Sequence, residues 1–254
     1  MGPKGEALPC GRLPAFVWLA PESLAHGYSA SYLVNGKLPT AMVRAGLAMF
    51  CFDPIGTGMR LTEATRFYER YPRWSLLGKM VHDARRAIDS LLQIPAIDPA
   101  RIFLVGFGSG GTAALFAAAL DQRVAGVASV CGFTPMRSDT AERPTGGLAR
   151  YAIREGGGLL PRLGFFVGEE RRIPIDYDEI LAAVAPRPLI CITPTRDREA
   201  NSSDVGATLD SVAGIYDQLG ASRQFIRHTP VDHRRFGPEI QQTLYAELRR
   251  IAGM

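Results

Sequence analysis

Cysteine is scarce in this sequence, and the cysteines that are present do not pair. Cys10, Cys51, Cys131 and Cys191 stand far apart, and no Cys-x-x-Cys motif is found. The last two fall in apolar runs that are typical of central strands. We therefore expect buried thiols in a reducing compartment, and we expect neither a metal site nor another cofactor.

Long apolar runs and basic blocks are also missing. The first residues, MGPKGEALPCGRLP, contain no apolar signal core, and no later run is long enough to cross a bilayer. A cytoplasmic location without membrane contact is the expectation. The formal net charge of +4 arises from arginines scattered among acidic residues. Such a pattern does not favour nucleic acid binding.

The composition that is present, 46% hydrophobic and 21% charged, is that of a folded globular protein and excludes disorder as the main state. Short apolar, β-branched runs alternate with segments of helical period, which predicts a parallel sheet with crossover helices. We expect one α/β domain over residues 1–254. Strands are predicted near 15–19, 47–52, 101–106, 124–131, 187–193 and 223–228, and helices near 38–45, 76–93, 110–120, 178–184, 204–219 and 238–252.

The segment 132–175 is rich in glycine, proline and arginine and has no clean period. Because long segments of this kind often carry function, we interpret it as a cap or lid insertion over the carboxyl ends of the strands.

The stretch RIFLVGFGSGGTAALF at 101–116 predicts a strand that enters a helix through a tight turn. A nucleophile elbow, G-x-S-x-G, needs small residues two before and two after the nucleophile. With Gly106 and Gly110 as these flanks, Gly108 occupies the nucleophile position. The other register puts Ser109 there, and Phe107 then stands where the backbone must approach closely. Sterics favour the first register, which leaves the elbow without a nucleophile.

Several stretches resemble the α/β-hydrolase superfamily, in particular its dienelactone hydrolase and acetyl xylan esterase-like branch. They are GxxxGG at 106–111, FDPIGTG at 52–58, RFYERYPRWSLLGKM at 66–80, GFTPMR at 132–137, LLPRLGFFVGEE at 159–170, VAPRP at 184–188 and PTRDRE at 194–199. The resemblance extends over nearly the whole chain from about residue 13. It implies a mostly parallel twisted sheet with helices on both faces.

The resemblance also implies a catalytic triad in the order serine, acid, histidine. Carried onto this chain, Asp197 follows the strand RPLICIT and His233 follows the strand RQFIRH. The oxyanion contacts would come from the amides of Ser109 and Glu22, because Pro21 in WLAPES has no N–H. Relatives usually have a histidine where Ala20 stands here.

One further feature departs from the resemblance, and three residue roles stay open. The usual amino-terminal hairpin has no counterpart, so the chain is a fragment or another chain covers the exposed sheet edge. Ser109 is either a displaced nucleophile or a small residue that caps its helix. Asp197 is a triad acid or a turn former, and His228 competes with His233 for the role of base.

Three possibilities follow as expectations. The first is hydrolysis of a carboxylic ester of the acetyl xylan or dienelactone type through a degenerate triad, in which Ser109 or a water attacks, His233 is the base and Asp197 orients it. The second is a catalytically silent hydrolase-fold subunit that binds a small ester or ligand, or joins a homo- or hetero-oligomer through the truncated sheet edge. A fragment or serine-replaced form of an active enzyme is a third.

Overall fold

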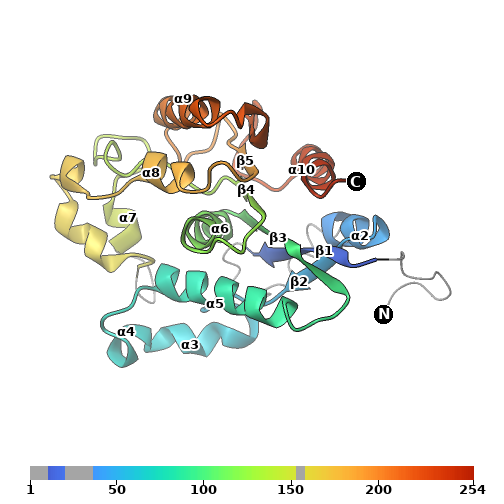
Figure 1. The fold of residues 1–254 in the computed structure, drawn as a ribbon. Coiled ribbons are helices and arrows are strands. Elements are labelled where there is room, and N and C mark those ends of the chain that lie inside the picture. Colours follow the sequence, from blue (N-terminus) through green and yellow to red (C-terminus); the bar gives the residue numbers. More distant parts are fainter. Residues whose placement is uncertain (1–10, 21–36, 153–157) are drawn as a thin grey trace.

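The computed structural model describes residues 11–20, 37–152 and 158–254, and within them the strands form one parallel sheet (Figure 1). Its order is β2-β1-β3-β4-β5-β6, and every neighbouring pair is parallel. The bounds are β1 Leu13–Leu19, β2 Ala48–Cys51, β3 Ile97–Phe107, β4 Gly126–Val130, β5 Leu189–Ile192 and β6 Phe225–His228. The predicted parallel sheet is confirmed, and β1 is the first strand in the described part of the chain.

The longer helices cover both faces of this sheet. They are α2 Lys37–Arg44, α5 Leu76–Leu91, α6 Ser109–Leu120, α8 Tyr177–Ala182, α9 Ser202–Gln218 and α10 Pro238–Ile251. All six coincide with predicted helices. The sequence did not indicate the short helices α3 Leu61–Thr65, α4 Phe67–Arg70 and α7 Ala149–Ala152, or the 3-10 turns η2 Gly58–Arg60, η3 Pro161–Phe166, η4 Glu170–Arg172 and η5 Ser222–Gln224.

Alternate residues of each strand enter two separate cores. In β3, Ile102 and Leu104 pack with α5, α6, α8 and α9, whereas Phe103 and Val105 pack with α2 and α10. This is the pattern of a parallel sheet that is buried on both sides. In Figure 1, α2 and α10 lie together on the right, away from α5 and α6.

Strand β3 begins earlier than the sequence predicted. Leu13 pairs with Ile97 and Ala15 pairs with Ile102, so the register shifts between these two pairs. The irregularity spans Asp98-Pro99, the dipeptide that was expected to lie before the strand. Proline is tolerated in a strand at such a bulge, because its missing N–H need not join the ladder.

Helix α8 is tied to the long segment 132–175 through its amino-terminal cap. The buried carboxylate of Asp176 accepts hydrogen bonds from the amides of Met136, Arg137 and Tyr177 at 2.8, 2.7 and 2.7 Å. Glu179 reaches back to the amide of Asp176 at 2.7 Å, which completes a capping box. One carboxylate therefore fixes the start of the helix and the path of the preceding segment.

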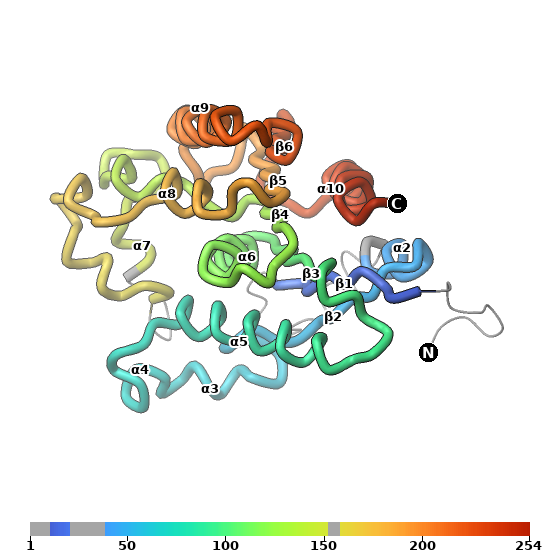
Figure 2. The backbone as a smooth tube through the Cα atoms, in the orientation of Figure 1, coloured from blue at the N-terminus to red at the C-terminus, as the bar shows by residue number. Residues whose placement is uncertain are grey.

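The described part of segment 132–175 runs through α7, η3 and η4. Figure 2 shows α7 and the chain after residue 158 on the side of the molecule opposite α2. Leu148 and Ile173 of this segment are buried in the core that contains α5 and α6. Its role as a cap or lid stays a prediction. Within the described ranges, no helix is both long and apolar enough to span a bilayer.

Candidate active site

Loops that follow the strands meet at one edge of the sheet, because parallel strands all end on the same side. The relevant loops follow β3, β4, β5 and β6. Cys131 and Phe133 after β4, and Thr193, Pro194 and Asp197 after β5, line one small pocket there. The start of α9 closes the pocket with Ser202, Val205 and Gly206.

The turn from β3 into α6 has the geometry of an elbow centred on Gly108. Gly108 has φ 58° and ψ −127°, a left-handed conformation that glycine adopts readily. A Cβ on Gly106 would stand 2.2 Å from the carbonyl oxygen of Gly110, and a Cβ on Gly110 would stand 2.0 Å from that of Leu19. Both flanking positions therefore require glycine, as the first register predicted.

Ser109 is the first residue of α6 and lies inside the protein. It is 8% exposed, and its Oγ has no hydrogen-bond partner among the described residues. A serine hydroxyl becomes a useful nucleophile when a neighbouring base accepts its proton. The described surroundings of Ser109 offer no such acceptor.

Asp197 lies at the same edge of the sheet and is buried, with 6% exposure. Its Oδ1 accepts a hydrogen bond from the amide of Glu199 at 2.8 Å. Its Oδ2 lies 3.5 Å from Nη1 of Arg234. The predicted acid thus faces a guanidinium.

Arg234 was not singled out from the sequence, and the structure brings its guanidinium to the site. Its Nη1 donates to the carbonyl oxygen of Cys131 at 3.0 Å, and its Nη2 lies 3.3 Å from the carboxylate of Glu199. The guanidinium carbon lies 5.9 Å from the centre of the Phe107 ring. Phe107 immediately precedes Gly108, so Arg234 lies beside the elbow. Arg234 directly follows His233 in the sequence DHRRF at 232–236, but the prediction considered only the histidine of this motif.

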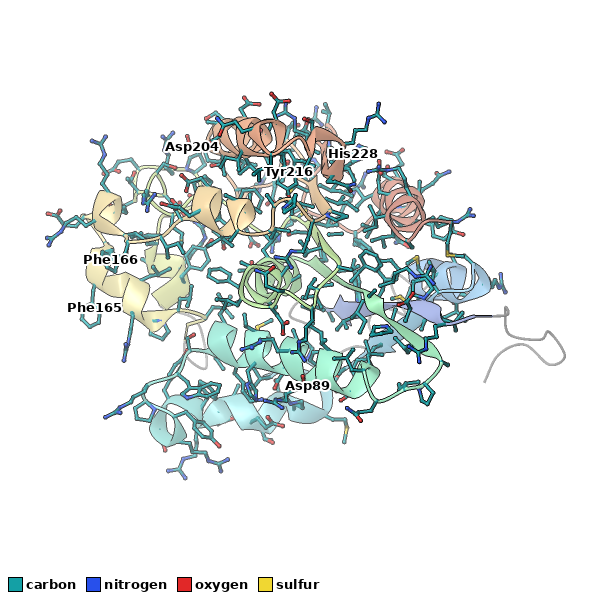
Figure 3. The ribbon with its side chains drawn as sticks, in the orientation of Figure 1. Asp89, Phe165, Phe166, Asp204, Tyr216 and His228 are labelled. Atoms are coloured by element: carbon teal, nitrogen blue, oxygen red, sulfur yellow. The ribbon has the colours of Figure 1, made fainter. Side chains whose placement is uncertain are left out.

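The two candidate histidines lie elsewhere. His233 is exposed, its amide donates to the carboxylate of Asp232 at 2.8 Å, and its ring forms no hydrogen bond within the described part of the chain. His228 ends β6, and its Nε2 lies 3.0 Å from Oε1 of Glu247 on α10. Figure 3 places His228 between β6 and α10. Across residues 11–20, 37–152 and 158–254, neither ring forms a hydrogen bond or ion pair with Asp197. The base assignment to His233 stays a prediction, as does the oxyanion role of Glu22, which lies outside the described residues.

Cys131 has an unusual backbone in this site. Its φ of 52° is left-handed, which is strained for a residue with a side chain. Burial, followed by the nearby charge of Asp197, raises the pKa of its thiol to about 12. A thiol that keeps its proton is a poor nucleophile. Cys131 is therefore a poor candidate for the nucleophile of this site.

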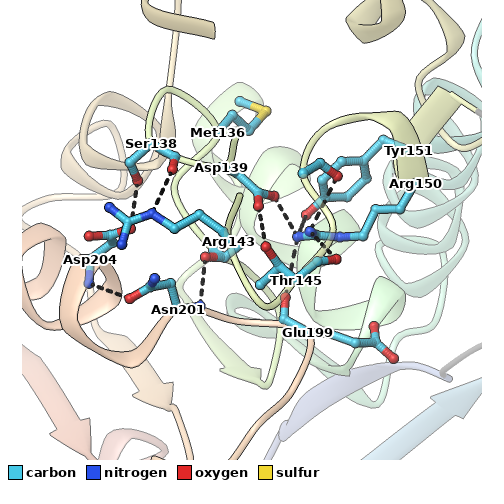
Figure 4. Close-up of polar contacts among 12 residues, drawn as sticks. Met136, Ser138, Asp139, Arg143, Thr145, Arg150, Tyr151, Glu199, Asn201 and Asp204 are labelled. Atoms are coloured by element: carbon cyan, nitrogen blue, oxygen red, sulfur yellow. Dashed lines mark hydrogen bonds and ion pairs between the residues drawn. The ribbon is translucent and has the colours of Figure 1, made fainter. Parts of the chain in front are cut away.

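A second polar network joins segment 132–175 to the loop that carries Asp197 (Figure 4). Arg150 lies 2.7 Å from the carboxylate of Asp139 and donates to the carbonyl oxygen of Glu199 at 3.3 Å. The hydroxyl of Ser138 donates to Asp204 of α9 at 2.9 Å. These bonds hold the loop after β5 in place from the side of segment 132–175.

Comparison with known proteins gives the family. The family model described as glucuronyl esterase of fungi matches residues 20–220. A 4-O-methyl-glucuronoyl methylesterase 1 from Wolfiporia cocos is 26% identical over 194 residues, which is 71% of this chain and 48% of that protein. The polyketide transferase ATR5 from Stachybotrys chlorohalonatus is 26% identical over 161 residues, 48% of this chain and 54% of that protein. The chain thus spans about half the length of these curated relatives.

Solved structures share the fold. A carbohydrate esterase family 15 glucuronoyl esterase from Caldicellulosiruptor kristjansonii superposes with a TM-score of 0.67 at 20% identity, covering 95% of this chain and 69% of that chain. The α/β-hydrolase fold expected from the sequence is confirmed. Because the family model matches well over half of its residues, this chain belongs to the glucuronyl esterase family of α/β-hydrolases.

Proposed function

We propose that this chain is a non-hydrolysing member of its family, which binds an ester or acid of a sugar at the strand ends, beside the elbow, without cleaving it. The observation that carries the proposal is the elbow, where the left-handed residue is Gly108 and has no side chain. Acyl transfer through a covalent intermediate needs a nucleophile at that point. Glycine has none to offer.

The displaced-nucleophile alternative, in which Ser109 attacks, has less support. Ser109 belongs to the first turn of α6, and its buried hydroxyl forms no hydrogen bond with any described residue. A water molecule could attack instead. Losing a triad member leaves only about 10³ to 10⁴-fold catalysis over water, so such activity would be weak.

Binding can persist where catalysis is lost. The amides at the start of α6 are held by the elbow, with the Gly108 amide bonded to the carbonyl oxygen of Val130 at 2.9 Å. Amides at a helix start attract a carbonyl or carboxylate oxygen. Since the Wolfiporia cocos relative is named for glucuronoyl esters, a glucuronic acid methyl ester is the ligand to try first.

The decisive experiment compares binding with turnover. The parent protein is incubated with methyl glucuronate and with p-nitrophenyl acetate, and separately with a fluorophosphonate probe that is then located by mass spectrometry. We expect binding of methyl glucuronate by calorimetry, hydrolysis no faster than in buffer, and no labelling. Labelling of Ser109, or hydrolysis that disappears in the variant Ser109→Ala, would contradict the proposal.

We also propose that a silent subunit of this kind works in an assembly through the edge of its sheet. In the described part of the chain, β2 is an edge strand, and all four of its residues are half-buried. An edge strand presents unpaired backbone groups to a partner strand. Light scattering after size-exclusion chromatography should show an oligomer, and a monomer at all tested concentrations would argue against self-association.

A further inference from the structure

We infer that Arg234 occupies the position in which an active relative would hold its histidine base, so that this site carries two replacements and not one. The inference rests on the proposed loss of catalysis and specifies how it arose. It also changes which substitutions are expected to restore hydrolysis. A serine at position 108 alone would face an arginine, which cannot accept its proton.

The backbone assigns Arg234 and Asp197 to the same side of the extended sheet edge. Beyond β5 and β6 the two chains meet again in a register shifted by one residue from the Ile192–His228 pair, and the amide of Arg196 donates to the carbonyl oxygen of Asp232 at 2.9 Å. Arg196 and His233 then form an isolated parallel bridge. Successive side chains of an extended chain point to opposite faces. Asp197 and Arg234 directly follow the two bridge partners, and alternation about the bridge would place both on the face opposite to that of His233.

The side chains agree with this register. Arg196 and His233 are both exposed, whereas Asp197 is buried and the Arg234 side chain is only 27% exposed. The inward pair is in contact, with Nη1 of Arg234 lying 3.5 Å from Oδ2 of Asp197. A triad acid needs an inward-facing partner of this kind, because the acid orients and stabilises the charged form of the base.

The elbow lies next to the same guanidinium. Arg234 stands over the ring of Phe107, and Phe107 is bonded to Gly108 through the chain. A side chain at position 234 is thus adjacent both to the acid and to the turn that would carry a serine. In the described part of the chain the His233 ring forms no hydrogen bond or ion pair with Asp197, and His228 is held by Glu247.

Arginine changes what this position can do. A guanidinium keeps its proton in proteins, so it neutralises Asp197 permanently and accepts no proton. With a serine introduced at position 108 and a histidine at position 234, the chemistry balances. The serine oxygen attacks the ester carbonyl carbon and its proton passes to the imidazole. The ester C–O bond breaks, and the leaving alcohol takes that proton. Water then cleaves the acyl-serine, releasing the acid and restoring the serine.

The kinetic test uses the full chain in six forms. They are the parent, Gly108→Ser, Gly108→Ser/His233→Ala, Gly108→Ser/Arg234→His, Gly108→Ser/Arg234→Gln and Gly108→Ser/Arg234→His/His233→Ala. Because a positioned base contributes about 10² to 10⁴-fold, we expect the histidine double variant to hydrolyse p-nitrophenyl acetate at least about 10²-fold faster than Gly108→Ser. The glutamine control should gain nothing, and removing His233 should change little. A rate in Gly108→Ser that is lost on His233→Ala would overturn the inference.

A second measurement does not need activity. The single variant Arg234→His is first shown to be folded by circular dichroism, and each of its imidazoles is then titrated by NMR. The introduced histidine should titrate above the ordinary pKa of about 6.5, and adding Asp197→Asn should bring it down. His233 should respond little to Asp197→Asn. Coupling of Asp197 to His233 and not to the residue at 234 would refute the inference.

The two proposals fail in different ways. Hydrolysis by the unmodified chain contradicts the non-hydrolysing function, whatever residue is the base. Coupling of His233 to Asp197 contradicts the role of Arg234, while the parent can still be inactive.

Discussion

The elbow provides a stability prediction in which one kind of substitution has opposite effects at two positions. Gly108→Ala adds a Cβ to a residue at φ 58° and ψ −127°. Gly214→Ala makes the same chemical change in α9, where an added Cβ meets no atom within 4 Å. The two variants therefore separate backbone strain from the general effect of replacing glycine.

The magnitudes follow from the two conformations. A residue with a side chain in a sparsely populated left-handed region costs about 1–3 kcal/mol. Alanine also reduces the entropy of the unfolded chain, which offsets about 0.4–1 kcal/mol. Gly108→Ala should then lower the free energy of unfolding by about 1–2 kcal/mol. Gly214→Ala should raise it by about 0.5–1 kcal/mol, as alanine does inside a helix.

The assay is equilibrium urea unfolding followed by circular dichroism, with the midpoints compared at a shared slope. Gly110→Ala is the third variant, because its Cβ would stand 2.0 Å from a backbone oxygen of Leu19 that belongs to a central strand. It should lose more stability than Gly108→Ala. If Gly108→Ala is as stable as Gly214→Ala, the described elbow conformation is wrong.

Three further predictions concern charge and burial. Asp176→Ala should lower the free energy of unfolding by about 3 kcal/mol in urea, because three backbone amides lose their acceptor, and Asp176→Asn should lose less. The hydrogen bond from Arg123 lowers the pKa of Asp121 from 3.8 to about 2, so stability present above pH 4 should fall toward pH 2, and less steeply in Arg123→Gln. Burial raises the thiol pKa of Cys131 and Cys191 from 9.0 to about 12, so stability should decline as the pH rises from 9 to 12. At pH 8.5, iodoacetamide should modify both cysteines in urea and neither in the folded protein.

Much of the fold could be predicted because it depends on local patterns. Apolar runs marked the six strands, and the period of three and four residues marked the helices, including α5. The short helices α3, α4 and α7 were not predicted, since one turn of helix has too few residues to show a period. The predicted start of β3 at residue 101 was too late. A proline was taken to exclude residues 98–99 from the strand, because the sequence does not show the bulge that accommodates it.

The sequence by itself determined the elbow. The glycines at 106, 108 and 110 specify a tight turn between strand and helix, and the steric needs of that turn are local, so residue order suffices to place Gly108 at its centre. Only the tertiary structure decided which side chain meets Asp197. His233 and Arg234 are neighbours in the chain, and a shift of one residue in the pairing beyond β5 and β6 would exchange their faces. That register depends on contacts between segments far apart in sequence, and it points Arg234 inward.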